Sequence, residues 1–160
     1  MNMGAIGTIN NLAGGVTVTI EDDFSKVDKT MKMGETIKLT DEQAVHFVHD
    51  RYYVGDETNV QRMKRQEQYK EGLKKNLGEK CSEDNKYPLT IYDALGDYMV
   101  TDINSQKFSK LALLVLKDKD AGTVSIDGTE SVDDLGFVEV QPDEESLQKA
   151  ILTLFYKEYK

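Results

Sequence analysis

The chain has 160 residues, a formal net charge of −9 and a hydrophobic content of 39%. This length is typical of one compact domain, and this hydrophobic content argues against wholesale disorder. No apolar run approaches the roughly 18 residues that a transmembrane helix requires, so a transmembrane helix is not expected in this sequence. We therefore expect a single domain over residues 1–160.

The N-terminal segment lacks the basic start and the apolar stretch of a secretory signal, and residues 1–12 are predicted to be flexible. The single cysteine, Cys81, permits no internal disulfide, which favours a reducing compartment. From these features we expect a protein of the bacterial cytoplasm or of a virion that is not secreted by a signal peptide.

Two short strands are predicted next. Val16, Val18 and Ile20 alternate with threonines, a period-two pattern that is typical of a half-buried strand. A second strand is predicted over residues 35–39, after a turn at Gly34. Together they predict an N-terminal β-hairpin.

Two tandem central helices are predicted over residues 41–77. Thr40 and Gln43 have the spacing of a capping box, which starts the first helix. We expect that helix to end near Gly55, and the second to end near Gly78. The second helix has only a thin apolar stripe, so it is predicted to lie on the surface.

The C-terminal half is predicted to be rich in strands. Residues 79–86 have the composition of a loop, and residues 87–100 fit either a helix or an extended segment. The six consecutive apolar residues 111–116 predict a strand that is covered on both faces. Residues 123–126 and 137–140 predict antiparallel partners for it.

A last helix is predicted to begin at Pro142 and Asp143, because Leu147, Ala150 and Leu154 recur at helical spacing on one face. We expect that amphipathic face to pack on the sheet. The predicted fold is therefore α+β, a single domain with a mainly antiparallel sheet.

The charge is strongly polarised along the chain. Residues 62–75 have a local net charge of plus four, whereas residues 117–145 have a local net charge of minus eight. The cations of the basic segment are Arg62, Lys64, Arg65, Lys70, Lys74 and Lys75. These six are the predicted interaction residues, because complementary surfaces set the orientation of protein contacts.

A second candidate site lies on the first central helix. His46, His49 and Asp50 share one side of it, and imidazole and carboxylate groups are zinc ligands. The histidines are three residues apart, whereas the usual helical motif places them four apart. Acidic neighbours disfavour a reactive thiolate at Cys81. No cofactor or metal is therefore predicted.

These observations predict a non-enzymatic interaction or assembly protein, such as a structural or accessory component of a bacteriophage. Its partner is expected to be another protein or a second copy of the chain, with no membrane contact. One alternative is a DNA-binding regulatory module that uses residues 41–77, although the overall acidity opposes nucleic acid. Another is a small metal-dependent hydrolase. A solvated helix with no partner is the simplest interpretation of the basic segment.

Overall fold

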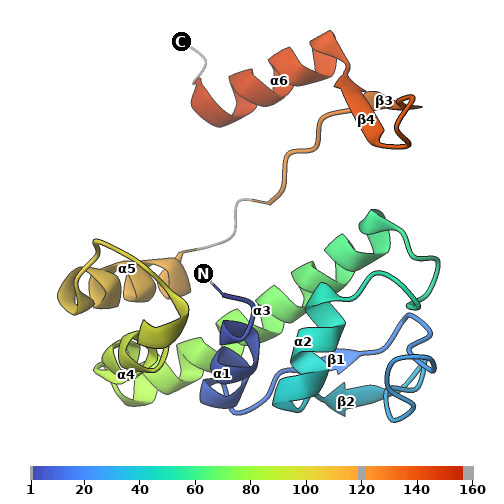
Figure 1. Cartoon of the computed structure of the whole chain (residues 1–160). Helices are drawn as coiled ribbons and strands as arrows, with labels where there is room; N and C mark the ends of the chain where they lie inside the picture. Colours follow the sequence, from blue (N-terminus) through green and yellow to red (C-terminus); the bar gives the residue numbers. More distant parts are fainter. Residues whose placement is uncertain (1, 119–121, 157–160) are drawn as a thin grey trace. The chain divides into compact units, whose positions relative to one another are not determined.

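The computed structural model describes residues 2–118 and 122–156 (Figure 1). These residues combine helices with small antiparallel sheets, which confirms the α+β class. The chain divides into two compact units, Met1–Asp118 and Lys119–Lys160. The boundary of a single domain over residues 1–160 stays a prediction. No helix of the described residues is long and apolar enough to cross a membrane.

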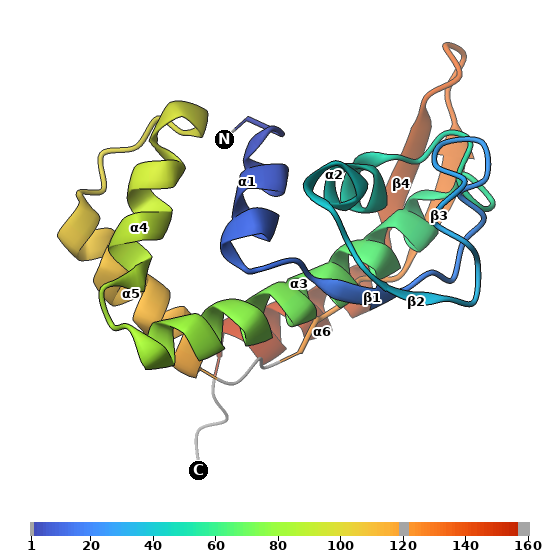
Figure 2. The ribbon, with the colours of Figure 1, turned by 90° about the horizontal axis from the view of Figure 1, so that it is seen from below.

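Unit 1 is mainly helical. Its elements are α1 (Ala5–Leu12), β1 (Thr17–Thr19), β2 (Thr36–Lys38), α2 (Asp41–His49), α3 (Asn59–Glu83), α4 (Tyr87–Ala94), the 3-10 helix η1 (Gly96–Tyr98) and α5 (Ser105–Lys117). The long helix α3 runs from the β1–β2 hairpin at one end to α4 and α5 at the other (Figure 2). It therefore connects the parts of the unit.

The predicted N-terminal hairpin is confirmed. β1 and β2 pair antiparallel, with Val18 opposite Ile37. Val16, Val18 and Ile20 are buried on one face of the strand, as the alternation predicts. On the other face, the hydroxyls of the paired threonines of β1 and β2 lie 3.0 Å apart.

The capping box that starts α2 is also confirmed. Thr40 Oγ1 accepts a hydrogen bond from the backbone N–H of Gln43, and the Gln43 side chain accepts one from Thr40 N–H. The helix ends at His49 rather than near Gly55, because Asp50 takes an extended conformation. Thr58 caps α3, so residues 50–58 form a loop between the two helices.

Helix α3 continues past Gly78 to Glu83, and the predicted loop over residues 79–86 is therefore wrong in its first part. Leu77 and Cys81 are both buried and lie four residues apart, so the apolar face of the helix continues across the glycine. Residues 87–94, which fit either a helix or an extended segment in the sequence, form α4.

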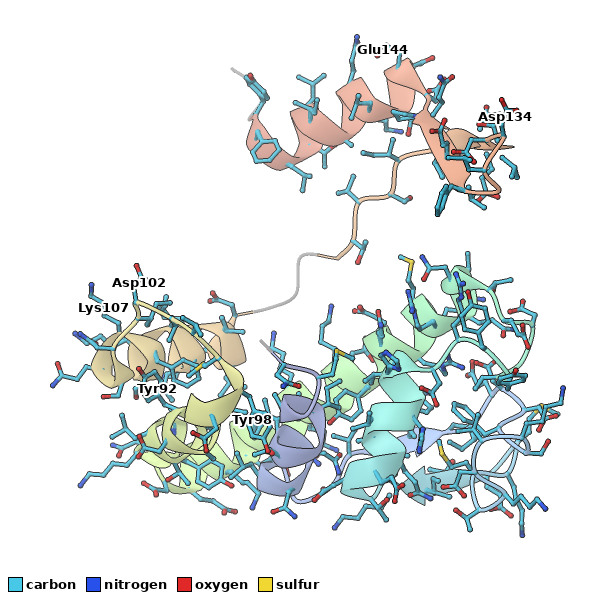
Figure 3. All side chains as sticks on the ribbon, in the orientation of Figure 1. Tyr92, Tyr98, Asp102, Lys107, Asp134 and Glu144 are labelled. Carbon is cyan, nitrogen blue, oxygen red and sulfur yellow. The ribbon has the colours of Figure 1, made fainter. Side chains whose placement is uncertain are left out.

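The central strand predicted over residues 111–116 is wrong, because this segment is helical in α5. The Asn104 side chain caps that helix by accepting a hydrogen bond from Lys107 N–H at 2.9 Å. A six-residue apolar run does not distinguish a strand from a helix by its periodicity. The helix packs on α4 through the Phe108 ring, 5.3 Å from that of Tyr92 (Figure 3).

Unit 2 contains β3 (Gly128–Val132), β4 (Val138–Pro142) and α6 (Glu144–Phe155). β3 and β4 form a second two-stranded sheet, so the single mainly antiparallel sheet is replaced by two separate hairpins. The return strand predicted over residues 123–126 is wrong, since pairing begins at Gly128. The predicted strand over 137–140 corresponds to β4.

The predicted C-terminal helix is confirmed as α6. Asp143 caps it by accepting a hydrogen bond from Ser146 N–H at 2.8 Å. Ala150 is buried, whereas Ile151, Leu154 and other apolar residues of the helix are exposed. The packing of this apolar face on a sheet stays a prediction.

The flexible segment predicted over residues 1–12 is also wrong, because it contains α1. Asn10 is only 1% exposed and joins three parts of unit 1. Its side-chain oxygen accepts a hydrogen bond from Val16 N–H at 3.0 Å, and its amide donates to the Leu39 carbonyl and to Asp41 Oδ1, each at 3.1 Å. These bonds explain why α1 is held against the hairpin and α2.

We expect Asn10→Ala to lower the free energy of unfolding by about 3 kcal/mol, because it leaves a buried N–H and a buried carbonyl without partners. Urea denaturation followed by circular dichroism measures this change. Asn11→Ala is the matched control, since Asn11 is exposed and its side chain donates a hydrogen bond to the exposed carboxylate oxygen Oδ2 of Asp41. Equal losses in the two variants would contradict the role of Asn10.

Candidate functional site: an arginine-lined pocket

A pocket of about 540 Å³ lies beside the loop that joins α2 to α3. This volume is within the range of roughly 300–1,000 Å³ that is typical of small-ligand sites. Its lining comes from the loop after β1, the end of α2 with the loop that follows, and the first turn of α3. The lining residues are Val27, His49, Asp50, Arg51, Tyr52, Tyr53 and Arg62.

Two guanidinium groups face this pocket from different elements. Arg51 stacks on the Tyr52 ring, 4.6 Å from its centroid, and donates a hydrogen bond to the Tyr52 hydroxyl. Arg62 donates to Asn59 Oδ1 at 2.7 Å, and its Nε is buried without a hydrogen-bond partner among the described residues. Both cations are thus held in place while part of their donor capacity is unused.

The imidazoles of His46 and His49 share one carboxylate. His46 Nδ1 lies 2.7 Å from one oxygen of Asp50, and His49 Nδ1 lies 3.0 Å from the other. The structure therefore brings the three residues of the proposed metal site together. Their contacts are mutual, however, and among the described residues no three His, Cys, Asp or Glu side chains form a group that could hold a metal ion.

Arg65 is a buried residue that holds together segments next to the pocket. It is 5% exposed, and it donates to Asp22 Oδ2 at 2.9 Å and to the Asp50 carbonyl. Burial lowers the pKa of Arg65, and the Asp22 carboxylate opposes that shift. Gln66 donates to the Val48 carbonyl at 2.9 Å, so α3 binds the last turn of α2 at two points. These bonds fix the position at which the loop begins.

The loop itself has an unusual backbone. Tyr53 and Glu57 have φ angles of 65° and 60°, a conformation that residues with a side chain rarely adopt. Each such residue costs about 1–3 kcal/mol. Tyr53 N–H donates to Glu57 Oε1 at 3.0 Å, and the buried Val54 anchors the loop in the core. Gly55 has a φ of 54°, and a Cβ there would lie 2.4 Å from Gln61 Oε1.

The six predicted interaction residues do not form one surface. Arg62 lines the pocket, and Arg65 is buried, so its assignment to an exposed contact surface is wrong. The remaining four are lysines. Lys70 pairs with Glu67 at 2.8 Å, and Lys74 donates to the Asp118 carbonyl at 2.8 Å. Lys64 and Lys75 are exposed. A protein partner for the exposed lysines stays a prediction.

Several residues of the acidic segment, residues 117–145, have local roles in unit 2. Asp133 Oδ1 accepts hydrogen bonds from the N–H groups of Leu135 and Phe137, which shapes the turn between β3 and β4. Glu144, labelled in Figure 3, lies in the first turn of α6, where a negative charge is favoured by the helix dipole. Part of the acidity is therefore explained by turns and caps.

Cys81 is buried in α3, and burial followed by the charge of Asp84 raises the pKa of its thiol. A raised pKa keeps a thiol protonated and unreactive at neutral pH. The prediction from its acidic neighbours is thus consistent with the structure, in which burial is the larger cause.

Sequence reasoning missed Arg51, Tyr52 and Tyr53 as site residues. The available signal was the run of polar and aromatic residues between two predicted helices, ended by Gly55. The charge of Arg62 makes it a predicted interaction residue, but only the fold shows that it lines the same pocket as Arg51. Two arginines in one pocket are typical of proteins that bind anionic ligands.

The chain belongs to the LytR_cpsA_psr family, whose family model matches residues 1–154. No curated protein matches the chain. The match to the family covers both units and therefore includes every residue of the pocket.

Solved structures support the same fold. Lin1025 from Listeria innocua is 24% identical, with 96% of this chain and 62% of that chain covered and a TM-score of 0.61. B. subtilis TagV is 18% identical, with coverages of 98% and 63% and a TM-score of 0.69. The protein gbs0355 from Streptococcus agalactiae is 21% identical, with 100% of this chain and 57% of that chain covered and a TM-score of 0.71. The chain thus spans about three-fifths of these structures.

Membership of the family overturns the predicted function. The family consists of enzymes that transfer cell-wall polymers, so the predictions of a non-enzymatic assembly protein and of a bacteriophage component are wrong. The alternatives of a DNA-binding module and a metal-dependent hydrolase are wrong as well. The polarised charge misled the prediction because it was interpreted as two surfaces, whereas its arginines occupy a pocket and the core.

We expect Arg65→Met to lower the free energy of unfolding by about 3–5 kcal/mol, because it leaves the Asp22 carboxylate buried without a counter-charge. Adding Asp22→Leu removes that charge, so the double variant should be more stable than Arg65→Met alone. The exposed neighbour gives the control Lys64→Met, with a change within about 0.5 kcal/mol. Urea denaturation measures all three, and similar losses for Arg65→Met and Lys64→Met would refute the role of the pair.

Proposed function

We propose that this chain is part of a transferase of cell-wall glycopolymers that acts at the cell envelope, and that the arginine-lined pocket binds a phosphate group of its substrate. The family supports the reaction class and the location, since its members transfer such polymers and are typically associated with the envelope. The observation that supports phosphate as the ligand is the presence of Arg51 and Arg62 in one pocket.

Phosphate fits the donor groups of the pocket. A guanidinium is a planar fork of N–H donors that is always charged and matches two oxygens of a phosphate. Arg51 is oriented by Tyr52, and Arg62 by Asn59, so little side-chain entropy remains to be lost on binding. The acidic chain repels anions at long range, which makes these two local cations decisive.

The neighbouring carboxylate does not cancel this preference. Asp50 also lines the pocket, but both of its oxygens are within hydrogen-bond distance of His46 and His49. A carboxylate that accepts two such bonds is oriented by the imidazoles rather than by a ligand. The pocket therefore offers an anion two guanidiniums whose partners inside the chain are neutral groups.

Arg51→Gln and Arg62→Gln are each expected to weaken the binding of inorganic phosphate by about 10- to 100-fold, the usual value of a charge-assisted hydrogen bond. Isothermal titration calorimetry at low salt measures the dissociation constants. Lys64→Gln is the matched control, because it removes the same charge from an exposed position on α3 outside the pocket. An equal loss in the control would show that binding depends on overall charge and would refute the pocket.

A further inference from the structure

We infer that Tyr53, together with Tyr52, forms a platform on which a sugar ring of the substrate stacks beside the phosphate-binding arginines. This inference rests on the proposed function, because it identifies a sugar subsite in the same pocket. Both rings line that pocket, and their side chains are 65% and 63% exposed. They are thus available to a ligand while being fixed near the guanidiniums.

The backbone of Tyr53 is strained. Its φ of 65° is unfavourable for a residue with a side chain, and glycine would adopt it without a penalty. Burial does not offset this cost, since Tyr53 is exposed. Strained residues of this kind cluster at ligand sites, where the surrounding structure maintains them.

The loop maintains this strain at several points. Tyr53 N–H is bonded to Glu57, and the next residue, Val54, is 1% exposed. Gly55 N–H donates to the Asp23 carbonyl at 3.1 Å, which ties the loop to the segment after β1. The backbone that carries the ring is therefore held in this conformation by its neighbours in the loop.

The aromatic surface at Tyr52 and Tyr53 has the chemistry that a sugar ring requires. The Tyr52 ring is covered on one side by the Arg51 guanidinium, and the arrangement leaves aromatic surface next to a cation. The face of an aromatic ring carries the negative part of its quadrupole, which attracts polarised C–H groups. A pyranose ring presents such C–H groups on one face and hydroxyls at its edge. His49, on the same pocket wall, supplies a polar group for those hydroxyls.

The platform is tested with two probes, inorganic phosphate and glucose 1-phosphate, in calorimetric titrations of the full chain. We expect glucose 1-phosphate to bind the unchanged chain about three- to tenfold more tightly than phosphate, which is the usual gain from one aromatic contact. Tyr53→Gly should abolish this difference, so that the two probes bind the variant with similar affinity. Tyr53→Phe should retain it, because the ring remains.

The midpoint of urea denaturation is a second measurement, and it distinguishes a ligand-binding tyrosine from one that only stabilises the fold. Tyr53→Gly relieves the strained φ, so its midpoint of urea denaturation should rise, whereas the loss of a structural ring would lower it. Tyr156→Ala is the matched control, because Tyr156 is 66% exposed and does not line the pocket. This control should change neither the midpoint nor the preference for the sugar phosphate.

The outcomes separate the inference from the proposed function. If phosphate binds through Arg51 and Arg62 but glucose 1-phosphate gains nothing, or if Tyr53→Gly keeps the gain, the sugar platform is wrong and the phosphate site stands. If neither probe binds the unchanged chain, the proposed function fails and the platform fails with it. A lower denaturation midpoint for Tyr53→Gly would also overturn the platform, because the ring would then be structural.

Discussion

Arg65 places a positive charge inside unit 1, where it bonds the carboxylate of Asp22 and the backbone carbonyl of Asp50. Its guanidinium also lies 5.2 Å from the centroid of the Phe24 ring, which stacks on Phe47 of α2. One side chain of α3 thus joins the loop after β1 to the end of α2. A buried charge is tolerated only when it is paired and hydrogen-bonded, so these segments are constrained together.

The pocket is a consequence of that constraint. Because the Asp50 carbonyl is held by α3, helix α2 ends there and the chain turns into a loop whose next residues are Arg51 and Tyr52. Arg62 precedes Arg65 by one helical turn, so the anchor and one pocket cation share a region of α3. The strained Tyr53 lies between these anchored positions. A rigid scaffold with strain concentrated in one loop is a common arrangement for binding sites.

Charge has different uses in different parts of this chain. In the basic segment, Arg62 faces a pocket, Arg65 stabilises the core and Lys74 bonds the end of α5. In the acidic segment, Asp133 and Asp143 shape a turn and a helix start. A linear charge count combines these roles, which explains why it predicted two docking surfaces and the wrong class of protein. Family membership corrected the class, and the fold explains the error.

The sequence by itself determined the features that depend on near neighbours. The hairpin, the capping box at Thr40 and the start of α6 follow from alternation and local hydrogen bonds, and they are found where the pattern predicts them. Only the tertiary structure decided that residues 111–116 are helical and that Arg51 and Arg62 line one pocket. The apolar run over residues 111–116 has no period that separates a helix from a strand. The pocket depends on contacts between different segments of the chain, and no local pattern contains that information.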